Sequence, residues 1–156
     1  MVVIVVDAAN VMGSRPDGWW RDRAGAAVRL HADLAHLAAG DGVVVEGHGA
    51  MPAGFVLVLE GAARGAMAAI EGAGAPGAVE DFAELVSAAA PGEVCVVLAA
   101  ESGPGSGDDA IVAVVSALSG KCLVVTADRE LRRRCEALGA SLMRPGWLLG
   151  QFGTRR

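Results

Sequence analysis

Residues 1–11 read MVVIVVDAANV, a run of mostly β-branched residues that stops at the carboxylate of Asp7. A short, continuous apolar run of this kind is typical of a buried β-strand. Later runs have the same form: FVLVL at 55–59, VCVVL at 94–98 and LVVT at 123–126. Helix-like segments separate these runs, which favours βαβ units and therefore an α/β fold with a parallel sheet.

Acidic residues follow the ends of these runs. They are Asp7 with Asn10 close behind, Glu60, the pair Asp108 and Asp109 after a glycine loop, and Asp128. The carboxyl ends of parallel strands share one edge of the sheet, which is where ligands bind in open α/β folds. We therefore expect these acids to form a negative pocket, which invites a divalent cation.

The remaining pattern predicts a single domain over residues 1–156. We expect strands at 1–6, 43–45, 55–59, 94–98, 123–126 and 141–143, and helices at 22–39, 79–89, 109–118 and 129–138. Residues 47–54 are expected to form a loop and 147–149 a terminal turn or helix. The Gly- and Ala-rich stretch 61–78 supports no assignment.

Length and composition exclude several classes of protein. The chain has 156 residues, of which 53% are hydrophobic, enough to bury one sizeable core. No apolar run approaches the roughly 18 residues that a membrane span needs. The first residues carry no basic leader, so we expect a cytoplasmic protein with no membrane partner. The three cysteines lack the paired spacing of a zinc site and are expected to be buried free thiols.

The net charge of −5 argues weakly against a nucleic-acid partner, because phosphate-binding proteins are usually basic. Five of the acids, however, are the strand-end residues themselves, and a bound metal would offset them locally. The arginines are also clustered: Arg15, Arg21 and Arg23; Arg129, Arg132, Arg133 and Arg134; and Arg144, Arg155 and Arg156. The distribution of charge therefore matters more than its sum.

Each acid alone has a structural interpretation. Asp7 and Asn10 could bond local backbone groups, and Asp108 and Asp128 are good helix N-caps. Independent caps have no reason to mark every central strand end, so the set as a whole favours a metal site. Oxygen ligands suit Mg²⁺ or Mn²⁺; Asp7 would coordinate the ion, and Asn10 could orient a water or a phosphate oxygen.

Other functions fit the sequence less well, each because of particular residues. A dinucleotide-binding loop at 103–108 is excluded because Asp108 takes the place of its third glycine and would repel pyrophosphate. Phosphatases with a strand-end nucleophilic aspartate usually carry a second aspartate two residues later, where this chain has Ala9. The pair Trp19 and Trp20 could stack bases, but such a pair more often packs a loop onto the core. The run of arginines at 132–134 is more typical of a solvated helix face than of an RNA track.

Three short motifs resemble those of NYN domains, a branch of the PIN-like nucleases. DAANV at 7–11 resembles their D-G-x-N-V signature, with Ala8 in place of the usual glycine. DDAIV at 108–112 resembles their paired aspartates at a helix start, and TADR at 126–129 their [ST]-x-D element. The bias toward Ala, Gly, Val and Arg resembles that of a GC-rich bacterial source such as an actinobacterium.

The resemblance implies a PIN-like, three-layer α/β/α sandwich around a central parallel sheet, with divalent-metal-dependent ribonuclease activity. Carried over by position, the metal-binding acids would be Asp7, Asp108, Asp109 and Asp128, with Asn10 as an adjacent polar group. Glu60 takes the place of an acid that some relatives have after the second strand.

The leading hypothesis is an endoribonuclease. One or two Mg²⁺ or Mn²⁺ ions, held by Asp7, Asp108 and Asp128 with help from Asp109 or Glu60, would activate a water for attack on phosphorus. Arg15 and Arg129 are the best candidates for phosphate contacts. The alternative is a non-catalytic module on the same fold that binds RNA or protein, and a homo-oligomer stays open in either case.

Overall fold

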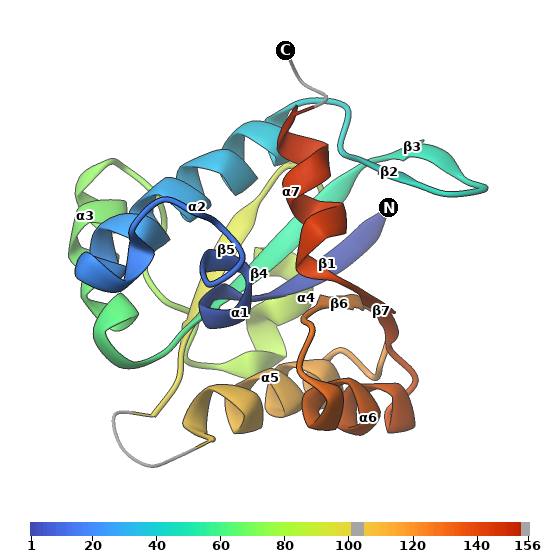
Figure 1. The fold of residues 1–156 in the computed structure, drawn as a ribbon. Coiled ribbons are helices and arrows are strands. Elements are labelled where there is room, and N and C mark those ends of the chain that lie inside the picture. The colour runs from blue at the N-terminus through green and yellow to red at the C-terminus, as the bar shows by residue number, and fades with distance from the viewer. Residues whose placement is uncertain (101–104, 154–156) are drawn as a thin grey trace.

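A five-stranded sheet forms the centre of the computed structural model, which describes residues 1–100 and 105–153 (Figure 1). Its strands are β1 (Val2–Asp7), β4 (Ala53–Leu59), β5 (Val94–Leu98), β6 (Leu123–Val125) and β7 (Ser141–Met143). Their order is β5-β4-β1-β6-β7, and every pairing is parallel. The expected parallel sheet is therefore confirmed. Part of the glycine loop before Asp108, together with Arg155 and Arg156, lies outside the described residues.

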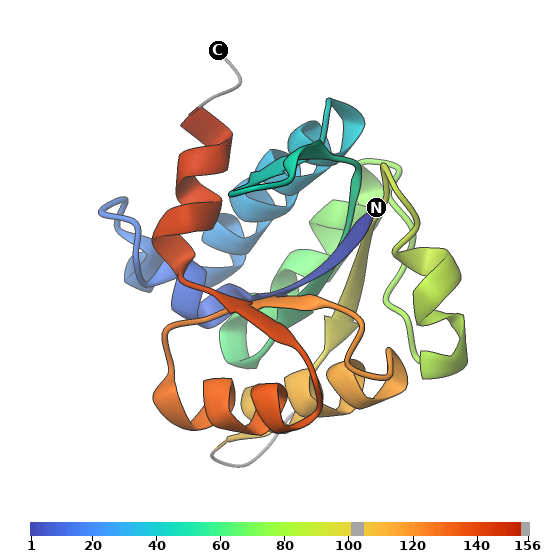
Figure 2. The same ribbon diagram turned by 90° about the vertical axis from the view of Figure 1, so that its right-hand side faces the viewer.

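Helices cover both faces of this sheet (Figures 1 and 2). They are α1 (Ala8–Met12), α2 (Arg23–Ala39), α3 (Met67–Gly72), α4 (Leu85–Ala88), α5 (Ser106–Ala117), α6 (Arg129–Ala137) and α7 (Pro145–Gly153). Short 3₁₀ segments occupy Trp19–Arg21, Gly61–Ala66 and Phe82–Glu84. Helices α1, α2, α3 and α7 pack on one face, and α4, α5 and α6 on the other. The molecule is the three-layer α/β/α sandwich that the sequence predicts.

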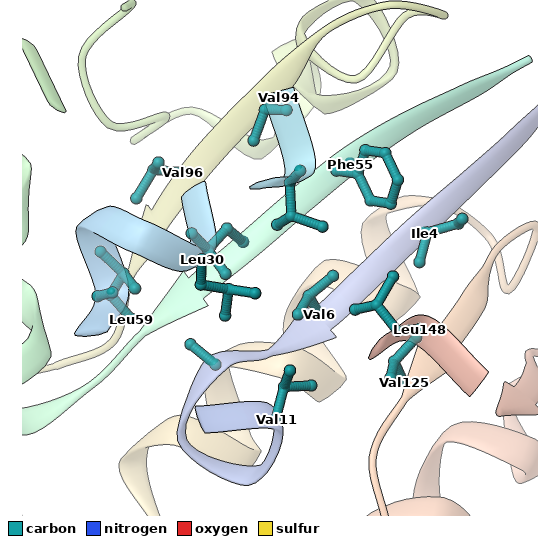
Figure 3. Packing of buried hydrophobic residues seen from close by; sticks show 14 of the residues in the cluster. Ile4, Val6, Val11, Leu30, Phe55, Leu59, Val94, Val96, Val125 and Leu148 are labelled. Atoms are coloured by element: carbon teal, nitrogen blue, oxygen red, sulfur yellow. The ribbon is translucent and has the colours of Figure 1, made fainter. Parts of the chain in front are cut away.

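The strands divide their side chains between two cores. In β1, Ile4 and Val6 enter the core under α2 and α7, whereas Val5 enters the core under α5 and α6. Figure 3 shows the first of these cores, with Leu30 of α2 and Leu148 of α7 against the sheet. Because side chains alternate along a strand, successive residues face opposite layers of helices.

The segment 47–54 was expected to be a loop, and that expectation is wrong. Residues Gly49–Met51 form β3, which pairs antiparallel with β2 (Val43–Val45), and β4 already begins at Ala53. Strand β3 is short and its first two residues are exposed, so no apolar alternation marks it in the sequence. The side chain of Gln151 on α7 holds the hairpin, accepting from the Val44 N–H at 2.8 Å and donating to the Val44 carbonyl at 3.2 Å.

The expected helix at 79–89 is also wrong over its first three residues. The Val79 N–H donates to the Val96 carbonyl at 2.8 Å, which ties the start of this segment to β5. Helical structure starts only at Phe82–Glu84 and continues as α4. The unassigned stretch 61–78 holds the 3₁₀ segment Gly61–Ala66 and α3.

Two simpler expectations can also be checked. Cys95, Cys122 and Cys135 are buried free thiols, as the sequence predicts, and burial raises the pKa of each to about 11. Within residues 1–100 and 105–153, no helix is long and apolar enough to cross a bilayer.

Substitution of Gly54 tests the packing of β4. A Cβ atom there would overlap the backbone carbonyl groups of Ala89 and Ala90. Gly54→Ala should therefore lower the free energy of unfolding by about 1–3 kcal/mol, as overpacking does. The matched control is Gly72→Ala at the end of α3, where a Cβ atom meets nothing within 4 Å. That change should be neutral or slightly stabilising in urea unfolding, and equal effects of the two would contradict the packing of β4 described here.

Candidate functional site

The register of the sheet brings three polar side chains together at its carboxyl edge. Asp7 pairs with Val58 of β4, and Val6 pairs with Val125 of β6. Thr126 is therefore level with Asp7 on one side, and Glu60 lies two residues beyond Val58 on the other. Their parity matches that of Val5, Val58 and Val124, whose side chains all enter the core under α5 and α6. Asp7, Glu60 and Thr126 thus belong to the same face of the sheet.

Asp7 is a buried carboxylate with few compensating contacts. It is 7% exposed, and its Oδ2 accepts from the Thr126 hydroxyl at 2.9 Å. Its Oδ1 accepts from the Asn10 N–H at 3.3 Å, so Asp7 also caps α1. Burial raises the pKa of Asp7 to about 6, and repulsion by Glu60 and Asp108 adds to the rise, while the two hydrogen bonds oppose it. Asp7 therefore caps a helix and is also a candidate metal ligand, and neither role excludes the other.

Thr126 connects Asp7 to the loop that carries Asp128. Besides donating to Asp7, its fully buried hydroxyl accepts from the Asp128 N–H at 3.2 Å. Asp128 in turn accepts from the Leu131 N–H at 2.9 Å and caps α6, as the sequence predicts. The Asn10 side-chain oxygen accepts from the Ala127 N–H at 2.8 Å, so Asn10 fixes the same loop from the other side.

The paired aspartates of α5 face different partners. The N-cap of this helix is Gly105, with φ of +79°, so the expectation that Asp108 caps it is wrong. Both aspartates lie in its first turn. Burial and repulsion by Asp128 and Glu60 raise the pKa of Asp108. Asp109 is exposed and forms an ion pair with Arg134 of α6 at 3.0 Å. Asp108 is therefore the member of the pair that lies among the strand-end acids.

Glu60 lies against the first turn of α5. A Cβ atom at Gly107 would overlap the Glu60 carboxylate, which shows how closely this side chain approaches the helix backbone. Glu60 also raises the pKa of both Asp7 and Asp108 by repulsion. Glu60, the acid that the sequence supports most weakly, therefore lies close enough to Asp7 and Asp108 to repel their negative charges.

The two arginines expected to contact phosphate lie in different surroundings. Arg15 forms an ion pair with Asp33 of α2 at 2.5 Å and stacks over the Phe152 ring of α7 at 5.3 Å. These contacts hold it against the helices rather than against the acids. Arg129 is exposed at the first position of α6, directly after Asp128. Arg129 is therefore the better placed of the two.

The acids supply oxygen ligands of the kind that bind Mg²⁺ or Mn²⁺. Among the residues that the structure describes, no three His, Cys, Asp or Glu side chains are arranged as a ready-made metal site. The buried Asp7 carboxylate has Glu60 and Asp108 as charged neighbours, both of the same sign. The donor set therefore fits a hard cation in its chemistry.

The sequence marks Thr126 only as the first residue of the [ST]-x-D element, and it does not mark Arg134 as a site residue. The contact of Thr126 with Asp7 was predictable in principle, because Thr126 lies on the same side of its strand as Val124 and is level with Asp7 once the strands are paired. Arg134 pairs with Asp109 and opposes the rise in the pKa of Asp108. Its contact joins residues 25 positions apart on two helices, and no local pattern signals that contact.

Comparison with known proteins bears on the fold. No protein-family model matches the sequence, and no curated protein matches it either. Among solved structures, a single-substitution variant of Rae1 (YacP) from Bacillus subtilis resembles this chain with a TM-score of 0.61 and 16% sequence identity. The match covers 99% of this chain and 76% of that one. At this level of identity, the match shows that the two chains share a fold.

Replacing Asp7 by asparagine should stabilise the metal-free protein at neutral pH. Because the pKa of Asp7 is higher in the folded state, its ionisation lowers stability as the pH rises from about 4 to about 6. A shift of this size corresponds to about 3 kcal/mol, and loss of the hydrogen bond from the Thr126 hydroxyl, whose acceptor oxygen becomes an amide NH2, offsets about 1 kcal/mol. Asp7→Asn should thus gain about 2 kcal/mol above pH 6 and lose about 1 kcal/mol below pH 4, where the carboxyl of the wild type is protonated.

Thermal unfolding in EDTA as a function of pH measures this difference. Asp41→Asn, at an exposed position after α2, provides the control and should follow the wild type at every pH. A destabilised Asp7→Asn protein at pH 7 would contradict the account of an uncompensated buried charge.

Proposed function

We propose that this protein is a divalent-metal-dependent ribonuclease that hydrolyses phosphodiester bonds of RNA at the carboxyl edge of its sheet. The observation that carries the proposal is the buried carboxylate of Asp7 with Glu60 and Asp108 as its charged neighbours. Buried charges are ordinarily paired or bound to a metal, because desolvation of an isolated charge is costly. A divalent cation at this position would offset that cost.

The residues suited to hold the cation are Asp7, Asp108 and Asp128, with Glu60 as a further ligand. Their donors are oxygen atoms only, which suits Mg²⁺ or Mn²⁺ better than zinc. Asp109 is less suited, because its carboxylate pairs with Arg134. When bound, the cation would lower the pKa of a coordinated water and stabilise charge on the leaving oxygen.

The remaining groups position the acids. The Thr126 hydroxyl fixes the orientation of Asp7, and the Asn10 side chain fixes the loop before Asp128. Arg134 moderates the negative charge near Asp108. Arg129, exposed directly beside Asp128, would contact a substrate phosphate. A metal site needs such second-layer contacts, because they hold its ligands in a productive orientation.

Two further observations support a nuclease over other metal-dependent enzymes. The motifs at 7–11, 108–112 and 126–129 resemble those of NYN domains, and their acids come from three separate segments that the fold brings to one edge. The fold itself is shared with a PIN-like protein. A cytoplasmic setting, as expected from the sequence, would give such an enzyme access to RNA.

Cleavage of RNA should require both the cation and Asp7. The wild type should cleave a labelled single-stranded RNA in Mn²⁺ or Mg²⁺ and lose that activity in EDTA. Asp7→Asn should lower the rate at least roughly a hundredfold, since it removes a charged metal ligand, while Asp41→Asn should cleave normally. Gel analysis of the products measures this. Equal rates in the wild type and Asp7→Asn would exclude the proposed site, and RNA binding without cleavage in any metal would favour a binding module.

Substitution of Thr126 tests whether its hydroxyl orients the candidate metal ligand Asp7. Thr126→Val keeps the side-chain shape but leaves Asp7 and the Asp128 N–H without the hydroxyl, so activity should fall roughly 10–100-fold. Thr126→Ser retains the hydroxyl and should restore most of the activity. The Mn²⁺ concentration at half-maximal rate should rise in Thr126→Val alone. If the valine and serine variants were equally impaired, the role of Thr126 would lie in packing instead.

A further inference from the structure

The arginine-rich helix α6 is not a uniform solvated face. Arg134 turns toward α5, where it pairs with Asp109. Arg129, Arg132 and Arg133 instead line a hollow of about 470 Å³ together with Glu136 and Leu142. Figure 2 shows α6 in orange, with β7 next to it, on the side of the molecule that faces the viewer. The arginines that follow one another in the sequence of α6 therefore belong to two surfaces, one toward α5 and one at the hollow.

The charge of this hollow is positive. Three guanidinium groups line it and one carboxylate, that of Glu136, opposes them. Arg133 also forms an ion pair with Glu130, which lies on the same helix. Neither Arg129 nor Arg132 forms an ion pair with any carboxylate in the described part of the chain. In a protein with a net charge of −5, this surface is suited to an anionic ligand.

Arg132 is held in place by the candidate active site. Its guanidinium donates to the Thr126 carbonyl at 2.8 Å, while the Thr126 hydroxyl donates to Asp7. Thr126 therefore links Arg132 of the hollow to the buried carboxylate of Asp7 through two hydrogen bonds. A guanidinium fixed in this way loses little side-chain entropy on binding and keeps further N–H groups for a phosphate oxygen.

We propose that Arg129, Arg132 and Arg133 bind the sugar–phosphate backbone of the RNA strand that leads into the acid cluster. The identity of the ligand rests on the proposed function, whereas the location of the site rests on the contacts of α6. Arg132 and Arg129 contact phosphates nearest the acids, and Leu142 offers an apolar surface to a ribose. No base edge is read by such a surface, so recognition is independent of sequence.

Binding of RNA in EDTA, where no cleavage occurs, tests this inference apart from catalysis. Fluorescence anisotropy of labelled oligouridylate and oligoadenylate gives the affinity as a function of KCl concentration. Arg129→Ala/Arg133→Ala should bind both RNAs roughly tenfold more weakly at low salt, and the slope of log K against log [KCl] should fall by about 0.7 for each arginine removed. Arg132→Lys, which keeps the charge but not the planar fork, should show an intermediate loss of affinity.

The matched control is Lys121→Ala/Arg29→Ala, which removes two positive charges elsewhere and should bind RNA like the wild type. Lys121 precedes β6 at the opposite edge of the sheet, and Arg29 is on α2. If the control and the arginine variant bind equally, or if the wild type binds neither RNA, the inference is wrong. Unchanged RNA affinity of Arg129→Ala/Arg133→Ala, with intact cleavage by the wild type in Mn²⁺, would overturn this inference alone. Weaker RNA binding by that variant, with no cleavage by the wild type in any metal, would instead overturn the proposed function.

Discussion

The parallel register of β1 between β4 and β6 is the constraint on which the candidate site depends. It sets Asp7 level with Thr126 and two residues short of Glu60, all on the face covered by α5 and α6. A slip of one residue would turn Asp7 toward the core under α2 and α7. The apolar alternation of β1 that builds the two cores therefore also aims the carboxylate.

The same arrangement stores an electrostatic cost in the fold. Asp7 is buried and has the acids Glu60 and Asp108 as charged neighbours, and burial is the chief reason for its raised pKa. Thr126 and the Asn10 N–H offset part of this cost by hydrogen bonding. An acid that served only to cap the five-residue helix α1 would gain nothing from deep burial, whereas a metal ligand gains a water-poor surrounding that strengthens its bond to the cation.

Strand runs and strand-end acids could be predicted because they are local in the sequence. The strand 94–98 and the cap at Asp128 agree with the structure. The hairpin of β2 and β3 could not be predicted, because Gln151, more than a hundred residues away, holds it through the Val44 backbone. Nor could the division of the arginines, since Arg134 finds Asp109 on another helix and Arg132 finds the Thr126 carbonyl. Contacts between distant segments leave no periodic signal.

The central claim is that the strand-end acids form one cation site, and a crystal grown with Mn²⁺ tests it most directly. Anomalous scattering locates the ion without any assumption about activity. The account predicts a peak at the carboxyl edge of the sheet, within roughly 2.0–2.6 Å of carboxylate oxygens of Asp7 and of Asp108 or Asp128. The absence of a peak at this edge in Mn²⁺-saturated crystals, with the acids arranged as in the metal-free protein, would contradict it.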